Sequence, residues 1–221
     1  MDRPRLDREV IALRVARELR DGDVVNLGIG IPTLCSQFVP EGRTVIYHSE
    51  SGVLGYGPLA EPGDEDIDLT NAGGQFLAPT PGMSFFNSAD AFAMIRGGHI
   101  DVAVLGAFQV SARGDLANWM LPQRGIGNVG GAMDLAAGVR RIIVAMEHVD
   151  RDGDPKIVNE CSFPLTGTAC VDLIVTDIAV IEVTSGGLVL TEVAPGWGAK
   201  EVQAQTEPAL IVAPDLTEME L

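Results

Sequence analysis

The sequence predicts a single α/β domain over residues 1–221, built on a largely parallel sheet that helices flank. Apolar runs of strand length alternate along the chain with segments that have helical spacing or helix-capping residues. The run 100–108 is almost continuously apolar, which is typical of a strand covered by helices on both faces. No repeat, low-complexity segment or linker divides the 221 residues, so one domain is the economical interpretation.

The first quarter of the chain predicts a helix, a strand, a short helix and a second strand. Residues 5–20 have apolar positions close to helical spacing, so we expect an amphipathic helix that ends at Asp21-Gly22-Asp23. The apolar run 24–27 is expected to be a strand, and Pro32 in the glycine-rich turn after it suits the first turn of a helix. A further apolar strand is expected at 44–47.

The rest of the chain continues the alternation. The acidic segment 61–68 indicates a solvated surface loop. Ser88-Ala89-Asp90 is expected to cap a helix that runs to Arg96 and ends at Gly97-Gly98. The turn 184–187 indicates a hairpin. The remaining expected elements are strands at 100–108, 141–146, 174–176, 179–183, 188–192 and 209–212, and helices at 131–138 and 199–205.

Charge and composition exclude several classes of partner. The net charge is −16 and the pI is about 4.4, whereas binding to nucleic acid or to an anionic membrane surface needs clustered Lys and Arg. A phosphorylated ligand stays compatible with this charge, because backbone amides or a partner's basic residues can bind it. We therefore expect small-molecule substrates, no nucleic acid and no membrane.

Location and metal content are also expectations at this point. No apolar run reaches the roughly 18 residues of a membrane span, and residues 1–5 lack the apolar core of a secretory signal. We expect a cytoplasmic protein whose three cysteines are reduced. The histidines and cysteines have no metal-site spacing, so no metal is expected.

Glu50 is the candidate for chemistry. It follows the strand expected at 44–47 and lies at the mouth of an expected loop with three glycines in the six residues 52–57. In an open α/β sheet, ligands bind where strands end at their carboxyl termini, and glycines there let backbone amides approach a ligand. A nucleophilic carboxylate suits this position, although a solvated loop charge or a helix cap is the commoner role of such a residue. His48 alternates with Ser49 along the strand, so we expect it to share the side of Glu50 and to influence the pKa of that carboxyl group.

Three glycine-containing turns are further candidates. The turn 125–131 precedes an expected helix, and its amides would stabilise a negative charge over the sheet unless the turn serves packing alone. Gly28-Ile29-Gly30 lacks the third glycine and the later acidic residue of a dinucleotide fingerprint, so we reject a Rossmann cofactor site. Asn71-Ala72-Gly73-Gly74 has residues that turns use for positive φ.

The segment 49–58, Ser-Glu-Ser-Gly-Val-Leu-Gly-Tyr-Gly-Pro, resembles the Ser-Glu-Asn-Gly-x-x-Gly-x-Gly-Pro signature of the β (B) subunit of two-subunit 3-oxoacid CoA-transferases. Ser51 stands where that family usually has Asn. Further blocks are similar to the family in the same order, at 25–33, 71–75, 84–86, 92–99, 116–119 and 130–135. Together they run nearly from end to end of the chain.

The resemblance implies a fold, a nucleophile and a set of ligand-binding residues. The fold is the CoA-transferase fold, which is ribose-phosphate-isomerase-like. Glu50 falls on the family's nucleophile, and Gly130 or Gly131 would hold the thioester oxygen as it becomes anionic. The residues implied to contact the substrate or coenzyme A (CoA) are Gly28, Ile29, Gly30, Ser51, Gly52, Asn71, Ala72, Gly73 and Gly74.

The resemblance also implies a reaction and a partner. The chain would move CoA from an acyl-CoA such as succinyl-CoA to acetoacetate or 3-oxoadipate, with CoA as substrate and covalent intermediate and with no permanently bound cofactor. The family's α subunit would complete a heterodimer or an α2β2 heterotetramer. Two alternatives stay open: a thioester hydrolase in which Ser51 admits water, and a ligand-sensing subunit without chemistry.

Overall fold

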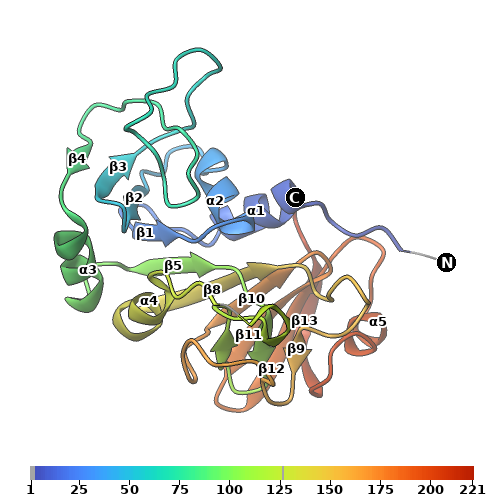
Figure 1. The fold of residues 1–221 in the computed structure, drawn as a ribbon. Helices are drawn as coiled ribbons and strands as arrows, with labels where there is room; N and C mark the ends of the chain where they lie inside the picture. The colour runs from blue at the N-terminus through green and yellow to red at the C-terminus, as the bar shows by residue number, and fades with distance from the viewer. Residues whose placement is uncertain (1–2, 126) are drawn as a thin grey trace.

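A ten-stranded sheet crosses the part of the chain that the computed structural model describes, residues 3–125 and 127–221 (Figure 1). In spatial order its strands are β13 (Leu210–Glu218), β12 (Gly187–Val193), β11 (Ala179–Thr184), β10 (Leu173–Thr176), β8 (Arg141–Met146), β5 (Val102–Leu105), β1 (Val24–Leu27), β2 (Ile46–Ser49), β3 (Val53–Tyr56) and β4 (Ser84–Phe85). The five strands from β10 to β2 are parallel, whereas β11, β3 and β4 pair antiparallel with their inner neighbours. The prediction of a largely parallel sheet is therefore confirmed for its centre.

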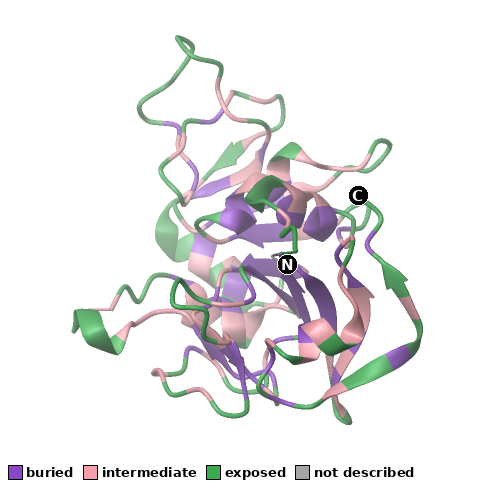
Figure 2. Cartoon of the chain, turned by 90° about the vertical axis from the view of Figure 1, so that its right-hand side faces the viewer, coloured by how far each residue is buried: buried purple, intermediate pink, exposed green. Residues whose placement is uncertain are grey.

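Helices cover both faces of this sheet, so the domain has three layers (Figure 1). The helices are α1 (Arg8–Ala16), α2 (Ile31–Leu34), α3 (Ser88–Arg96), α4 (Ala132–Gly138) and α5 (Ala199–Gln203). Successive side chains of β5 alternate between the faces. Val104 belongs to the same buried cluster as Ile11 of α1, and Leu105 belongs to the other cluster with Ile95 of α3 and Leu135 of α4. Figure 2 shows the central strands buried between these layers.

A second sheet of three short strands was missed by the sequence analysis. It consists of β7 (Leu116–Ala117), β6 (Gln109–Ser111) and β9 (Ile157–Val158), and its apolar side chains join the buried cluster of α3 and α4. Strands of two or three residues are too short to show a periodic pattern, because alternation needs at least four residues to be seen.

The first helix is shorter than the expected 5–20. It begins at Arg8, because the carboxylate of Asp7 caps it by accepting a hydrogen bond from the backbone N–H of Val10. Leu6 lies outside the helix, and its N–H donates to the backbone carbonyl of Asp177. The cap therefore begins the helix three residues later than the apolar spacing alone indicates.

The segment after Glu50 is a hairpin and not the loop that the glycines indicate. Residues 53–56 form β3, which pairs antiparallel with β2. Gly52 makes the turn possible, since its φ is +108° and a Cβ built there would lie 2.0 Å from the carbonyl oxygen of Phe86. Three smaller corrections concern α3, which Asn87 caps in place of Ser88, β5, which ends before 106–108, and β13, which extends beyond 212.

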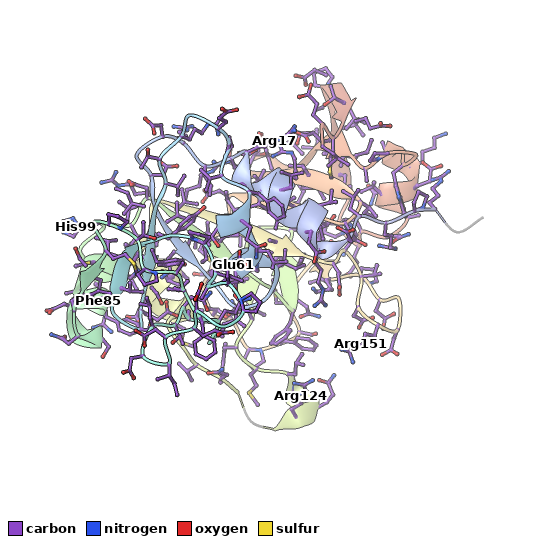
Figure 3. The ribbon with its side chains drawn as sticks, turned by 90° about the horizontal axis from the view of Figure 1, so that it is seen from above. Arg17, Glu61, Phe85, His99, Arg124 and Arg151 are labelled. Atoms are coloured by element: carbon purple, nitrogen blue, oxygen red, sulfur yellow. The ribbon has the colours of Figure 1, made fainter. Side chains whose placement is uncertain are left out.

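Arg17 lies far from Arg124 and Arg151 in Figure 3, so these three residues do not form one basic patch. Within the described residues, none of the helices reaches the length and hydropathy that a membrane crossing requires.

His148 joins three elements beneath the sheet edge. It is fully buried just beyond β8, and its ring nitrogens lie 2.9 Å from the hydroxyl oxygens of Thr176 at the end of β10 and Thr206 after α5. Burial, together with the positive charges of Arg5 and Lys156, lowers the pKa of the imidazole to about 3. The neutral ring is therefore part of the folded state.

We expect the free energy of unfolding to fall as the pH is lowered from about 6.5 towards 3, because the unfolded chain then binds a proton that buried His148 does not. The slope from this group is about 1.4 kcal/mol per pH unit. Urea unfolding at several pH values, compared between the wild type and His148→Gln, measures this difference. The exposed His99→Gln is the matched control, and an identical slope in the His148 variant would contradict the prediction.

Candidate active site

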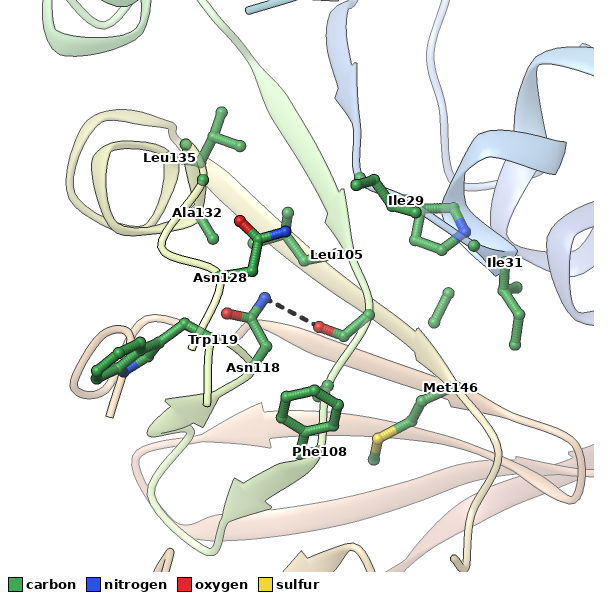
Figure 4. Close-up of a pocket in the computed structure, with 18 of the residues that line it drawn as sticks. Ile29, Ile31, Leu105, Phe108, Asn118, Trp119, Asn128, Ala132, Leu135 and Met146 are labelled. Carbon is green, nitrogen blue, oxygen red and sulfur yellow. Dashed lines mark hydrogen bonds between the residues drawn. The ribbon is translucent and has the colours of Figure 1, made fainter. Parts of the chain in front are cut away.

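Four parallel strands end at the same edge of the sheet and supply the walls of one cavity. Gly28 follows β1, Glu50 follows β2, Gly106 follows β5 and Glu147 follows β8. The cavity has a volume of about 500 Å³. Its other walls come from the turn before α4 and from Asn118, as Figure 4 shows. The prediction that Glu50 lies at the carboxyl end of a parallel strand is confirmed.

The carboxylate of Glu50 is held from one side by an amide. Oε2 accepts a hydrogen bond of 3.1 Å from Nδ2 of Asn26, which lies on β1 next to the end of β2. Oε1 lies 3.6 Å from the position that a Cβ on Gly131 would take. One oxygen is thus fixed by β1, while the other faces the backbone that begins α4.

Asn26 also connects Glu50 to His48. The same Nδ2 lies 3.1 Å from Nδ1 of His48, which is fully buried and stacked on Phe86 with ring centroids 6.1 Å apart. Burial lowers the pKa of His48, and the negative charge of Glu50 opposes this shift. A neutral ring accepts at Nδ1 and carries its proton on Nε2, so Asn26 can donate one hydrogen to each partner.

His48 therefore lies on the side of Glu50, as expected, and reaches it through Asn26. Among the described residues, Oδ1 of Asn26 and Nε2 of His48 have no hydrogen-bond partner. Sequence reasoning missed Asn26, although one signal was present: it is a polar residue in the otherwise apolar strand Val24–Leu27.

The glycines predicted to stabilise an oxyanion lie next to Glu50. Gly131 and Gly130 both line the cavity, directly before α4. Gly131 has a φ of −89°, and Gly130 has a φ of +45°, which favours glycine. Backbone N–H groups at the start of a helix lack partners within the helix, so they are donors available to a ligand. Ile126 of the expected turn 125–131 lies outside the described residues.

The turn 28–30 forms the opposite wall. The backbone N–H of Gly28 donates to the carbonyl of Val104, and a Cβ on Gly28 would lie 3.2 Å from that oxygen. A side chain at this position would require β5 to shift by a few tenths of an ångström, so glycine suits the close contact of β1 with β5 at the cavity. Ile29 is 65% exposed although it lines the cavity, and Figure 4 shows it across the cavity from Asn118 and Phe108.

The other residues implied to contact ligand do not line this cavity; they are Ser51, Gly52, Asn71, Ala72, Gly73 and Gly74. Asn71 holds its own turn, because its side-chain oxygen accepts from the N–H of Gly73 at 2.9 Å and of Gln75 at 3.0 Å. A Cβ on Gly73 would lie 3.5 Å from the hydroxyl of Thr33, which donates to the carbonyl of Gly28. The turn thus supports the cavity wall from behind.

The structure adds cavity residues that the sequence analysis did not select. Asn118 donates from Nδ2 to the carbonyl of Gly106 at 3.0 Å and accepts from Thr166, so its amide closes the end of β5 (Figure 4). The apolar residues Phe108 and Met146 and the charged residues Arg8, Glu147 and Lys156 complete the lining. Among the described residues, no group of three or more His, Cys, Asp or Glu side chains is arranged to hold a metal ion.

Comparison with known proteins decides the family. The model of the coenzyme A transferase family matches residues 8–205. The chain belongs to this family. The β (B) subunit of the 3-oxoadipate CoA-transferase of Pseudomonas putida is 50% identical over 208 residues, which are 94% of this chain and 97% of that protein.

Other relatives in this transferase family have different names. The β (B) subunit of the succinyl-CoA:3-ketoacid coenzyme A transferase of Helicobacter pylori is 49% identical over 90% of this chain and 96% of its own length. The β subunit of the acetate CoA-transferase of Escherichia coli K12 is 49% identical over 93% of this chain and 94% of its own length. An acyl-CoA transferase of Escherichia coli O157:H7 shares the fold, with a TM-score of 0.76 and 21% identity over the whole of this chain and 44% of that one.

We expect Gly131→Ala to leave the protein folded but to disable the carboxylate. The new methyl group would lie 3.4 Å from the ring of Phe92 and 3.6 Å from Oε1 of Glu50, both ordinary contacts, and the φ of −89° suits alanine. The methyl would occupy the space through which a carbonyl reaches Glu50. The free energy of unfolding should change by less than about 1 kcal/mol, while kcat/KM falls by about 10²-fold or more.

Thermal unfolding and steady-state kinetics of the wild type and of Gly131→Ala measure the effects on stability and on activity separately. Gly186→Ala is the matched control, because Gly186 lies in an exposed hairpin turn where a Cβ meets only Thr184, at 3.7 Å. An unchanged kcat/KM in the Gly131 variant would show that this space is not on the path of the reacting group.

Proposed function

We propose that this chain is the β subunit of a CoA-transferase that moves CoA from succinyl-CoA to a 3-oxoacid such as acetoacetate or 3-oxoadipate. The observation that carries the proposal is the carboxylate of Glu50 in the cavity, with Asn26 on Oε2 and Gly131 beside Oε1. The names of the relatives, which include the β (B) subunits of 3-oxoadipate and succinyl-CoA:3-ketoacid transferases, support the substrate class.

A carboxylate nucleophile explains how CoA moves between two acids without ATP. Glu50 attacks the thioester carbonyl, the C–S bond breaks, and a mixed anhydride and CoA thiolate form. The thiolate then attacks the glutamyl carbonyl, the C–O bond breaks, and the first acid leaves as a carboxylate while CoA stays on Glu50 as a thioester. The second acid reverses these steps, so the kinetics are ping-pong. CoA is substrate and covalent intermediate, and the proposal includes no permanently bound cofactor.

Each neighbour of Glu50 has a role in this scheme. Asn26 binds Oε2 and so orients Oε1 as the attacking atom. The oxygen of the thioester becomes negatively charged as the new bond forms. Backbone N–H groups of Gly130 or Gly131 stabilise that charge, since donors fixed in place before the reaction need no reorganisation.

The α subunit of such a transferase is the proposed partner, in a heterodimer or an α2β2 heterotetramer. Anhydride and thioester both hydrolyse, so water must be kept from Glu50 during turnover. Ile29 and Val129 line the cavity and are nevertheless 65% and 52% exposed. Apolar side chains at the mouth of a reactive cavity are suited to a covering chain, and the relatives are themselves named as single subunits of their enzymes.

A thioester hydrolase is the second candidate, and Ser51 is the observation that favours it. Its hydroxyl lies 2.8 Å from that of Ser49, so the residue after Glu50 turns its polar atom to its own strand and presents no amide to the ligand. The two candidates differ in what discharges the glutamyl intermediate, which is a free acid in the transferase and water in the hydrolase.

We expect a CoA-sized adduct on the peptide that contains Glu50 when this chain, together with its α subunit, is incubated with succinyl-CoA or acetoacetyl-CoA. Mass spectrometry of the intact chain and of its peptides detects the adduct. Addition of succinate or acetoacetate should discharge it faster than water does. Glu50→Gln should lose the adduct and lower kcat by about 10³-fold or more, because the amide is a poor nucleophile.

Glu61→Gln is the matched control, since Glu61 lies exposed on the loop after β3 and outside the cavity (Figure 3). Release of CoA that does not depend on a free acid would contradict the transferase activity and support the hydrolase activity. No adduct and no turnover with either acyl-CoA would contradict both enzymatic activities and favour the role of a ligand-sensing subunit.

A further inference from the structure

The cavity of Glu50 has a second charged region. Arg8, Glu147 and Lys156 line it together with Glu50. Lys156 is one of only two lysines in the sequence and lies opposite His148, to whose carbonyl its backbone N–H donates at 3.2 Å. It therefore sits just beyond the end of β8, on the far side of the cavity from β2.

Two of the acidic groups near Lys156, Glu147 and Asp177, already have arginine partners. Arg8 donates two hydrogen bonds, of 3.0 and 3.2 Å, to one oxygen of Glu147. Arg5 donates to Asp177 at 2.7 Å. Within the described residues, no carboxylate oxygen lies within 4.0 Å of the ammonium of Lys156, and its side chain donates no hydrogen bond.

Burial makes this ammonium a group that an anion would stabilise. Desolvation lowers the pKa of Lys156 to about 8, and Arg8 lowers it too, while Glu147, Asp177 and Asp150 oppose the shift. Asp150 is exposed and accepts hydrogen bonds from two amides of its own loop. The nearby His148 is neutral. A cation at the wall of a cavity, without an ion pair, offers a bound carboxylate a charge-assisted hydrogen bond.

The spacing of the strands suits a short acyl group between Glu50 and Lys156. β2 and β8 are separated by β1 and β5, which places their backbones about 14 Å apart. A four-carbon dicarboxylic acyl group with a contact of about 3 Å at each end spans about 10 Å, and the side chains of Glu50 and Lys156, which reach into the cavity from its two sides, cover the rest of the distance. Apolar Leu105, Phe108 and Met146 line the same cavity (Figure 4), which suits a chain of methylene groups.

We propose that Lys156 binds the distal carboxylate of a dicarboxylic acyl group whose thioester carbon lies against Glu50. The chain thereby selects acyl-CoA donors that end in a carboxylate over donors that end in a methyl group. This inference rests on the proposed function, because it places the reacting thioester at Glu50. Lys156 is the specificity-determining residue of the cavity.

The test compares two donors in the complex of this chain with its α subunit. Lys156→Met keeps the length of the side chain and removes its charge. We expect kcat/KM for succinyl-CoA to fall by about 30-fold or more, which is the scale of a lost charged hydrogen bond, and kcat/KM for acetoacetyl-CoA to change less than about threefold. Lys200→Met, at the exposed lysine of α5, is the matched control and should change neither value.

A pH profile and a conservative variant separate this role from a structural one. The preference for succinyl-CoA should decline as the pH rises through about 8, since the ammonium then loses its proton. Lys156→Arg keeps its charge at higher pH and should keep the preference there. With lysines labelled at the ε-carbon, NMR of the complex gives one signal for each lysine of this chain. Succinate should raise the pKa of the Lys156 signal and the uncharged four-carbon butanamide should not.

Four results would overturn the inference. Equal loss for both donors in Lys156→Met would indicate a contact to CoA itself or a structural effect. An unchanged preference for succinyl-CoA in Lys156→Met would show that another group binds the distal carboxylate. Absence of the Glu50 adduct in the wild type would remove the proposed function and this inference with it, whereas an adduct from acetoacetyl-CoA without any donor preference would remove this inference alone.

Discussion

The parallel pairing of β2, β1, β5 and β8 is the constraint on which the site depends. Parallel strands end at the same edge of a sheet, so four separate connections deliver Gly28, Glu50, Gly106 and Glu147 to one cavity. Gly28 has no side chain to press against β5 where the two strands meet at the cavity. A site assembled in this way gets its precision from the buried layers beneath it rather than from the loops themselves.

Charge within the cavity contrasts with charge over the whole chain. The net charge is −16. In the cavity, however, the amide of Asn26 donates to the carboxylate of Glu50, and Lys156 lies on the far side. An acidic surface repels anionic substrates at long range, and salt screens that repulsion within about 10 Å. Recognition of a negatively charged donor therefore depends on short-range donors in the cavity and on charges that the partner contributes.

The sequence predicted the central elements well because their signals are local. The strands at 24–27 and 141–146 are apolar runs of strand length, and the structure has them with these bounds. The position of Glu50 followed from one strand and its glycines. Asn26 and Lys156 were missed because their proximity to the cavity depends on which strands are neighbours, and no local pattern encodes that order. The hairpin after Glu50 was missed since its glycines indicate a turn equally well with or without strands around it.

The contact between Gly52 and Phe86 ties the turn after Glu50 to a distant part of the chain. The N–H of Phe86 donates to the carbonyl of Gly52, next to the two-residue strand β4, and β3 together with the long connection 57–83 separates these partners. The contact of Phe86 with the turn after Glu50 is therefore maintained by the chain that connects the two residues. A single proteolytic cut in that connection would leave the parallel centre of the sheet intact but lower the effective concentration of β4 beside Gly52, so activity is lost before the fold is.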